Sequence, residues 1–372
     1  MRFEFATATR IVFGAGTVRE AAAAAAEMGR RALLVACRSA DIERLGIAGA
    51  PFRVHGEPTV DIVRQGTQRA RDEDCDLVIA MGGGSAIDTG KAIATLLANG
   101  GDPLDYLEIV GQGRPLTRPS APFIAIPTTA GTGAEVTRNA VLASPEHRVK
   151  ASLRSPHMLP SLAVVDPELT LDLPPALTAS TGLDALTQLI EPYVSCRANA
   201  MTDLYCVEGM RLAASALRRA WRDGHDLAAR TDMAFASLLG GLALANAGLG
   251  AVHGFAAPLG GMFHAPHGAL CAALLPHAMR INIAALRGSE RLARYATVAQ
   301  VLTGRADAAP EDGADWVASL CRDLEIQPLR VYGVSPGDVP ALAAQAAQSS
   351  SMKANPLILT RDQLEELLTR AI

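Results

Sequence analysis

The sequence contains 372 residues, of which 49% are apolar and 19% are charged, and its formal net charge is -4. This composition excludes an intrinsically disordered chain, and the length predicts two domains. No block of basic residues stands out, and aromatic residues make up only 4% of the chain. We therefore expect no nucleic acid as partner, because neither a basic surface nor a base-stacking platform is indicated.

The N-terminal segment and the cysteines favour a cytoplasmic protein with reduced thiols. Glu4 and Arg10 interrupt the apolar residues at the start of the sequence, so we expect neither a signal peptide nor a membrane anchor. The cysteines form no C-x-x-C pair, which argues against a zinc knuckle or a disulfide framework. Residues 233–279 lack charged side chains. Their prolines, glycines and histidines nevertheless favour buried helices over a membrane span.

The first part of the chain alternates between helical and strand patterns. The alanine-rich segment 21–28 predicts a helix, and apolar runs at 32–36, 76–81 and 123–127 predict strands. Uninterrupted apolar runs are typical of strands buried on both faces. The fold class we expect here is therefore α/β, a mainly parallel sheet with helices on both sides. Residues 111–122 are rich in Pro and Gly and predict a surface loop.

Helical patterns dominate the chain after Val164–Pro167. Helices are expected over 177–190, 200–221, 227–244 and near the end, within 360–372. We therefore predict a boundary near residue 160, between an α/β nucleotide-binding domain (1–160) and an all-α domain that carries the metal and substrate (161–372).

A glycine loop, Met81–Asp88, lies between a predicted strand and a predicted helix. Its three glycines, 82–84, would allow a ligand to approach the backbone closely, and the following helix N-terminus favours a phosphate. Ser85 is the expected N-cap and Asp88 its capping-box partner. The alternative is an ordinary tight turn, because the loop matches neither G-x-G-x-x-G nor a Walker loop.

A second polar loop, Pro127–Glu135, follows another predicted strand. Its hydroxyls and glycines suit a nucleotide bound at the carboxyl end of a sheet, although alone it could be an ordinary turn. Two such loops in one domain favour the nucleotide hypothesis.

The helical half contains a candidate metal constellation. Asp184 and Gln188 lie at positions i and i+4, on one face of a helix. One straight helix would separate His253 from His267 by about 21 Å. Pro258 and the glycines that follow it allow the chain to turn between them. Two imidazoles and a carboxylate would make a three-ligand site for zinc or ferrous iron; the alternative is that both imidazoles are hydrogen-bonded core residues. His264 is a candidate for the cleft, and His277 is expected to pack structurally.

The order of these motifs resembles that of the iron-containing (group III) alcohol dehydrogenase family. The resemblance rests on motifs spread along the chain: Phe13–Gly16, GGGSAIDTGK (82–91), PTTAGTGAE (127–135), Val165–Pro167, GLDALT (182–187), HGFAAPLGG (253–261), PHG (266–268) and Asn355–Pro356. It implies an N-terminal nucleotide-binding domain, a helical C-terminal domain and a cleft between them. It also implies nicotinamide-dependent oxidation of alcohols or reduction of carbonyls, and it favours a homo-oligomer.

The resemblance also implies residue roles. The cofactor-binding positions are Gly83, Gly84 and Ser85 for the pyrophosphate, Asp88 near the nicotinamide ribose, Thr128, Thr129 and Thr132 along the nucleotide, and Lys150. The implied metal ligands are Asp184, His253 and His267. Two positions depart from the family pattern. Gln188 stands where the fourth ligand is usually a histidine, and Ala257 stands where a histidine suspected in proton transfer is often found.

The strand over 33–36 should end beside the adenosine ribose, at Cys37 and Arg38. Family members that prefer NAD often carry an aspartate near this point, which Cys37 cannot replace, whereas Arg38 could pair with a 2′-phosphate. We therefore expect NADPH to be used at least as well as NADH. The alternative is that Arg38 is only a solvated surface charge.

The function expected from the sequence is that of an NAD(P)-dependent oxidoreductase for an alcohol and the corresponding aldehyde or ketone. A divalent metal, Fe(II) or Zn(II), would act as a Lewis acid on the substrate oxygen. With Ala257 in place, the proton would leave through water, the ribose hydroxyls or His264. Three alternatives stay open: a metal-free reductase resembling maleylacetate reductases, a lyase resembling dehydroquinate synthase, and a non-catalytic nucleotide-binding protein.

Overall fold

The computed structural model describes residues 2–38, 40–147, 149–263 and 265–372. The chain forms two compact units. The first contains residues 5–129 and 133–171, and the second contains residues 1–4, 130–132 and 172–372. The boundary that we expected near residue 160 therefore falls at 171/172. It falls later because the strand at 162–165 and the short helix after it belong to the first unit.

The first unit is built on a six-stranded parallel sheet, in the order β1-β8-β5-β4-β2-β3. Its strands are β1 Arg10–Phe13, β2 Ala32–Cys37, β3 Gly49–Val54, β4 Leu77–Gly82, β5 Phe123–Pro127 and β8 Leu162–Val165. An antiparallel pair, β6 Asn139–Ser144 and β7 Val149–Arg154, forms a second sheet. The helices are α1 Ala21–Met28, α2 Val60–Asp72, α3 Gly84–Asn99 and α4 Pro103–Tyr106, with the 3-10 helices η1 Thr17–Glu20, η2 Ile42–Leu45, η3 Ala134–Val136, η4 Pro156–Met158 and η5 Pro167–Thr170.

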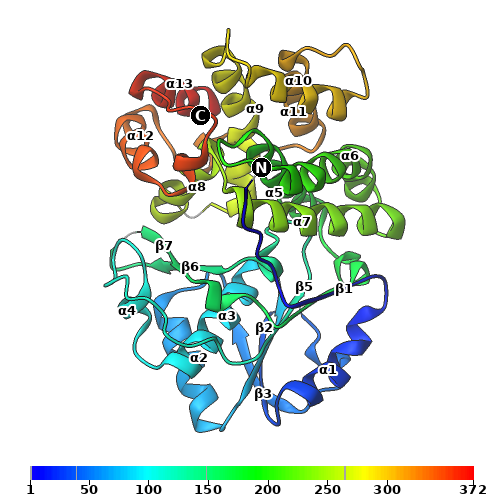
Figure 1. The fold of residues 1–372 in the computed structure, drawn as a ribbon, viewed down its shortest axis with the longest axis vertical. Helices are drawn as coiled ribbons and strands as arrows, with labels where there is room; N and C mark the ends of the chain where they lie inside the picture. The colour runs from blue at the N-terminus through cyan, green and yellow to red at the C-terminus, as the bar shows by residue number, and fades with distance from the viewer. Residues whose placement is uncertain (1, 39, 148, 264) are drawn as a thin grey trace. The chain divides into compact units, whose positions relative to one another are not determined.

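Both faces of the parallel sheet are covered, as the apolar runs predict. Alternate residues of β2 point to opposite faces: Leu33 and Val35 pack in the apolar cluster with α2 and α3, whereas Leu34 and Ala36 pack in the cluster with α1. Figure 1 shows α1 on one side of the sheet and α2 and α3 on the other. The core of this unit is therefore divided between the two faces of one sheet.

The three predicted strands are confirmed as β2, β4 and β5. The sequence reading missed β3, which contains Gly49, Pro51 and Arg53 and alternates between buried and exposed residues. It is an edge strand paired only with β2 in the sheet order. Edge strands tolerate proline and charge, so their sequences lack the continuous apolar run of a central strand.

The second unit is helical. Its α-helices are α5 Pro175–Val194, α6 Ala200–Arg222, α7 Leu227–Ala247, α8 Ala251–Met262, α9 His267–Ala285, α10 Leu292–Thr303, α11 Pro310–Asp323, α12 Val339–Gln348 and α13 Arg361–Ala371, with the 3-10 helices η6 Leu329–Tyr332, η7 Pro336–Asp338 and η8 Ser351–Ala354. The predicted helices correspond to α5, α6, α7 and α13. Helices α5, α6 and α7 pack side by side (Figure 1).

Two helices of this unit, α7 and α9, are long and apolar enough to cross a membrane by length and composition. Within the unit, 67% of the apolar window of α7 and 72% of that of α9 are buried. Such burial is what a core helix shows. It agrees with the interpretation of residues 233–279 as buried helices.

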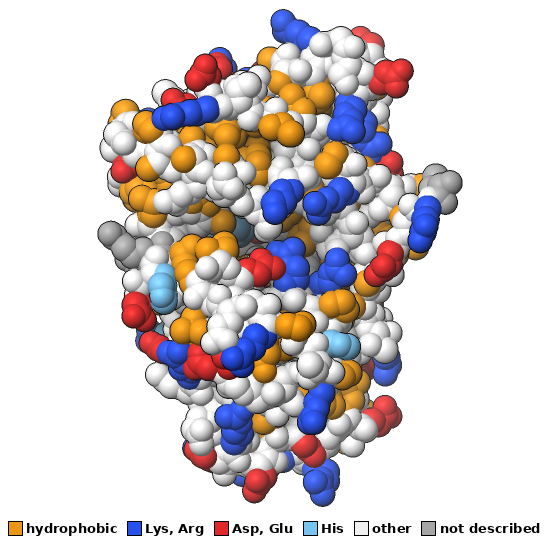
Figure 2. Space-filling model, turned by 60° about the vertical axis from the view of Figure 1, so that its left-hand side comes forward, with side chains coloured by type: hydrophobic (Ala, Val, Ile, Leu, Met, Phe, Trp, Pro, Cys, Tyr) orange, Lys and Arg blue, Asp and Glu red, His pale blue; other side chains and the backbone are white. Residues whose placement is uncertain are grey.

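Surface charges of both signs are mixed. Exposed arginines lie beside carboxylates, as in Arg211–Glu208 at 2.6 Å and Arg219–Asp226 at 2.7 Å. Figure 2 shows basic and acidic side chains on both the upper and the lower part of the face in view. Charges of both signs therefore occur on that face, in keeping with the small net charge.

Candidate functional site

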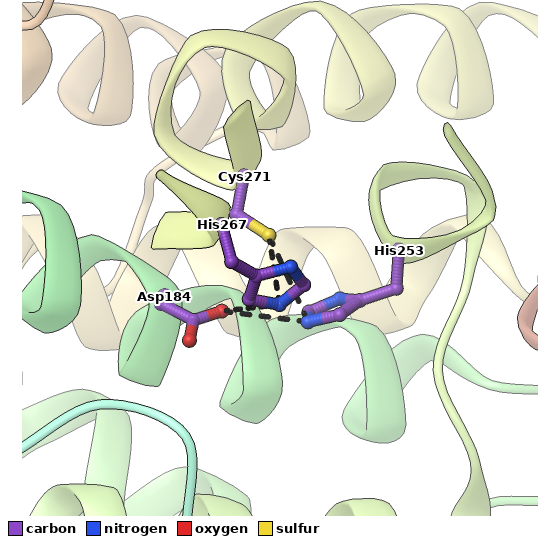
Figure 3. Close-up of side chains that lie close together, drawn as sticks. All are labelled: Asp184, His253, His267 and Cys271. Carbon is purple, nitrogen blue, oxygen red and sulfur yellow. Dashed lines mark hydrogen bonds and ion pairs between the residues drawn. The ribbon is translucent and has the colours of Figure 1, made fainter. Parts of the chain in front are cut away.

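Three helices of the second unit bring the predicted metal ligands together. Asp184 lies on α5, His253 on α8 and His267 at the start of α9. The Asp184 Oδ1 atom lies 3.4 Å from His253 Nε2 and 3.7 Å from His267 Nε2. Figure 3 shows these side chains pointing toward one another, with Cys271 of α9 beside them. One donor atom from each of the four residues lies within 4.8 Å of every other.

The turn that unites the two histidines differs from the predicted one. Helix α8 continues through Pro258 to Met262, and the chain turns only between Met262 and His267. Gly268 then allows the start of α9 to approach α5, because a Cβ atom at this position would lie 2.5 Å from the Ser180 carbonyl oxygen. Asp184 is one turn further along α5, so this close approach brings His267 near the carboxylate.

Glu191 fixes the orientation of His253. One carboxylate oxygen of Glu191 accepts a hydrogen bond from the backbone N–H of Val252 at 2.7 Å, and the other lies 2.7 Å from His253 Nδ1. A carboxylate can only accept, so Nδ1 carries a proton, and Nε2 is the ring nitrogen that would offer its lone pair to a metal bound in the cluster. The side chain of Asn355 accepts from the N–H of Ala251 at 3.2 Å and completes the cap of α8.

The cluster favours positive charge. Burial alone would lower the pKa of His267, but neighbouring Cys271 and Asp184 outweigh it and raise this pKa to about 9. At His253, too, burial alone would lower the pKa, but Cys271 and Asp184 outweigh it and raise the pKa well above its ordinary value. Burial would raise the pKa of Asp184, but the two imidazoles hold it below its ordinary value. A cation placed among these groups would therefore be stabilised.

The donor set fits a divalent metal ion. Asp184 Oδ1 is buried and has no hydrogen-bond partner among the residues described, although both imidazoles are close. A buried carboxylate oxygen without a partner is costly, and a metal ion would satisfy it. Imidazole, carboxylate and thiol are all ligands of zinc, and the first two also serve ferrous iron.

The remaining predicted residues of this half have different positions. Gln188 is buried one turn after Asp184 on α5, and its Oε1 atom also has no partner among the described residues. His277 lies in α9, where burial and the charges of Arg280 and Arg370 lower its pKa to about 4. His264 lies outside the described residues.

The sequence reading did not identify two residues of the site, Cys271 and Glu191. Cys271 follows His267 at i+4, and Glu191 follows Asp184 at i+7, so each shares a helix face with a predicted ligand. Those spacings were the available signals. Neither spacing alone indicates that the side chain reaches the site, because it does not show how α5, α8 and α9 pack.

The predicted cofactor residues lie at the carboxyl ends of neighbouring strands. The strand order reverses between β2 and β4, because β2 leads outward to β3 and β4 leads to β5 on its other side. Ligands of open α/β sheets bind at such a reversal. Arg38 follows β2, Gly83 and Ser85 follow β4, and Thr128 and Thr129 follow β5.

The glycine loop differs from the prediction at its cap. Gly83, not Ser85, is the N-cap of α3, and Gly84 is already helical. Asp88 is not a capping partner; its Oδ2 atom accepts from the N–H of Val141 at 2.9 Å. Because Gly83 has no side chain, it leaves the N–H groups of the first turn of α3 without a side-chain cap. These N–H groups are therefore suited to an anionic ligand.

Two other predicted cofactor residues have specific surroundings. The Lys150 ammonium lies 3.0 Å from the Glu57 carboxylate, and the Lys150 side chain is only 8% exposed. Thr132 belongs to the segment 130–132, which clusters with the helical unit. The second polar loop is further held by the fully buried Lys91, which donates to the carbonyl oxygens of Ala134 and Asn139 at 2.7 and 2.8 Å.

The chain thus combines a parallel sheet of nucleotide-binding type with a helical unit that carries a carboxylate, imidazoles and a thiol at one point. This combination is compatible with a metal-assisted nicotinamide oxidoreductase. Comparison with known proteins agrees. Residues 8–167 match the model of the iron-containing alcohol dehydrogenase, and residues 178–372 match that of the C-terminal region of the Fe-containing alcohol dehydrogenase family.

Individual relatives are similar along most of their length. The 1,3-propanediol dehydrogenase of Klebsiella pneumoniae is 41% identical over 85% of this chain and 81% of its own. Alcohol dehydrogenase 4 of Saccharomyces cerevisiae is 37% identical over 89% of this chain and 85% of its own. The crystal structure of a 1,3-propanediol oxidoreductase superposes with a TM-score of 0.92, at 34% identity and full coverage of both chains.

The chain belongs to the iron-containing alcohol dehydrogenase family. It is an enzyme that interconverts alcohols and aldehydes with a nicotinamide cofactor. The family uses NAD(H) and a metal ion.

Proposed function

We propose that this enzyme reduces short hydroxylated aldehydes, and oxidises the corresponding alcohols, with a divalent metal held by Asp184, His253 and His267. The observation that carries this proposal is the convergence of these side chains around a buried carboxylate oxygen without a hydrogen-bond partner. A metal ion bound there supplies a Lewis acid for the substrate oxygen.

The chain's own residues perform the remaining tasks. Glu191 holds His253 with Nε2 directed into the cluster. The first turn of α3 binds the pyrophosphate of the cofactor through backbone N–H groups, with Gly83 and Gly84 leaving room for it. The nicotinamide cofactor would supply or accept the hydride, and the protein's contribution would be to orient cofactor and substrate. Ala257 cannot carry a proton, so the alcohol proton leaves through water, the ribose hydroxyls or His264.

The enzyme uses NADPH at least as readily as NADH. Arg38 is exposed after the end of β2 and makes no ion pair among the described residues. Arg53 of β3 donates to the carbonyl oxygens of Cys37 and Ala40 at 3.0 and 2.7 Å, so a second guanidinium borders the same strand end. Two cations, and a cysteine at position 37 where family members that prefer NAD often carry an aspartate, favour a 2′-phosphate.

The position of Gln188 favours a substrate with an additional hydroxyl group. Its amide oxygen is buried and unpaired among the residues described, one helical turn from Asp184. A hydroxyl of the substrate would satisfy this acceptor. The relatives named 1,3-propanediol dehydrogenase and lactaldehyde reductase point to the same class of small substrates.

The direct test is a panel of short aldehydes and alcohols, with and without a second hydroxyl, assayed by nicotinamide absorbance with each cofactor. We expect stoichiometric oxidation of NADPH during aldehyde reduction, and higher kcat/KM for hydroxylated substrates. Product formation without net change in the nicotinamide would instead indicate the lyase alternative. Selective turnover of an acidic oxo-substrate would indicate the maleylacetate reductase alternative. A strong preference for NADH would refute the cofactor assignment alone.

A further inference from the structure

Cys271 lies at the cluster formed by Asp184, His253 and His267, and in the sequence only its i+4 spacing from His267 indicates that it could join them. It is fully buried on α9, one turn after His267. Its Sγ atom lies 3.8 Å from His253 Nε2 and 3.7 Å from His267 Nε2. Figure 3 shows the sulfur directed at both imidazoles, opposite the helix that carries Asp184. The thiol therefore faces the same point as the other three donors.

The distances between donors match those of one tetrahedral ion. Typical zinc–ligand bonds place two nitrogen or oxygen ligands about 3.3–3.4 Å apart, and a sulfur and a nitrogen ligand about 3.5–3.6 Å apart. The observed separations are 3.4 and 3.7 Å for the carboxylate–imidazole pairs, and 3.7 and 3.8 Å for the thiol–imidazole pairs. These four pairs are thus within a few tenths of an ångström of tetrahedral separations, and the two remaining donor pairs lie within 4.8 Å.

We propose that the Cys271 thiolate is the fourth protein ligand of the metal, replacing the imidazole that Gln188 does not provide. This inference rests on the proposed metal-dependent function and goes beyond it in naming the ligand. The replacement comes from a different helix: the missing donor would lie on α5, and the thiolate is supplied by α9.

Charge favours Cys271 over Gln188 as the ligand. Asp184, His253 and Cys271 are 1%, 7% and 0% exposed, whereas the His267 side chain is 38% exposed, so three of the four donors are buried. Asp184 and a thiolate neutralise two positive charges, whereas Asp184 and a neutral amide leave one uncompensated in a buried site. A ligand set that includes a thiolate also favours zinc over ferrous iron more strongly than a set of only imidazole and carboxylate does. The enzyme should therefore select zinc when the two ions compete.

Cobalt(II) substitution tests the ligand by spectroscopy rather than activity. We expect the cobalt-loaded wild type to show a thiolate-to-cobalt charge-transfer band in the near ultraviolet. Cys271→Ser should lose this band. Cys321→Ser is the matched control, because its Sγ atom contacts the Ala272 carbonyl oxygen of the same helix from outside the cluster. It should retain the band, as should Gln188→Leu. Loss of cobalt binding in Gln188→Leu, with binding intact in Cys271→Ser, would assign the fourth ligand to Gln188 and overturn the proposal.

X-ray absorption on the zinc-loaded wild type does not depend on any variant. One sulfur scatterer at about 2.3 Å is expected. A shell of only nitrogen and oxygen, with one zinc bound per chain and turnover intact, would refute Cys271 ligation and leave the proposed function standing. Sulfur ligation without turnover of any aldehyde or alcohol would support the ligand assignment and reject the proposed function.

Discussion

At the scale of single residues, Glu191 orients one side chain of the candidate metal site without being one of its four donors. Its two oxygens engage the backbone of α8 and the ring of His253 at the same time. The carboxylate selects the imidazole tautomer in which Nε2 is unprotonated. Asp184, Gln188 and Glu191 form one polar stripe on a buried helix, so the ligand, a neighbouring amide and the orienting group share α5.

Glu191→Gln should weaken metal binding about 10- to 100-fold. The remaining oxygen can keep the bond from Val252, but the amide NH₂ then faces Nδ1 and favours the tautomer that protonates Nε2. Zinc affinity measured by competition with a chelator checks this expectation. Glu208→Gln, on the exposed face of α6 beside Arg211, is the isosteric control and should leave zinc affinity unchanged. Equal affinities in all three proteins would exclude an orienting role for Glu191.

At the scale of elements, the site depends on how closely α9 approaches α5. Gly268 is the second residue of α9, and the Ser180 carbonyl of α5 occupies the space that a side chain would need. The packing of two helices therefore positions His267, and a change at the contact should affect both stability and metal binding.

Gly268→Ala should lower the free energy of unfolding by about 1–3 kcal/mol, because the added methyl group overpacks the contact. It should also weaken zinc binding, since His267 is the adjacent residue. The denaturation midpoint and the chelator competition provide the two measurements. As a control, Gly337→Ala adds a methyl group at an exposed site where the nearest atom is 3.7 Å away, and stability should change by less than about 0.5 kcal/mol. A stable Gly268→Ala variant with unchanged zinc affinity would contradict the expectation.

The same helix carries a group whose titration should be visible in stability. Burial, together with the charges of Arg280 on α9 and Arg370 on α13, lowers the pKa of His277 to about 4, from an ordinary value of 6.5. The stability that neutral His277 contributes is therefore complete above about pH 6.5. It decreases as the pH falls from 6.5 towards 4 and is lost below about 4, and the total loss is limited to about 3 kcal/mol.

His277→Gln should remove this dependence. We expect the difference in free energy of unfolding between wild type and variant to decrease between pH 6.5 and pH 4, with the wild type losing more. Urea denaturation at a series of pH values measures this difference, and subtraction cancels the carboxylates that both proteins share. A difference that stays constant over this range would show that His277 titrates as in the unfolded chain.

At the scale of the whole molecule, the sequence predicted the central strands and the long helices because their apolar patterns are strong. Strands β2, β4 and β5 are buried on both faces, so their composition alone indicates them. Strand β3 was missed because an edge strand with a proline and an arginine lacks that pattern. The later boundary between the units has a similar cause: β8 is short, and its place in the sheet is set by pairing with β1 and β5.

The metal site was predicted only in part, because its geometry depends on tertiary packing. Spacing left open whether His253 and His267 meet, and the turn that unites them lies after α8 rather than within it. Cys271 joins the cluster only because α9 begins at His267, which places both residues on one helix face. The spacing of these two residues was visible in the sequence, but their proximity to Asp184 was not.

We expect turnover to require a metal ion held by Asp184, His253 and His267. The most direct measurement is aldehyde reduction, followed by NADPH absorbance, during titration of chelator-stripped enzyme with zinc under anaerobic conditions. We expect no turnover in the stripped enzyme and a linear recovery that ends at one zinc per chain, with ferrous iron recovering activity less completely. Full turnover by enzyme shown to contain no metal, with no gain on adding either ion, would contradict the account.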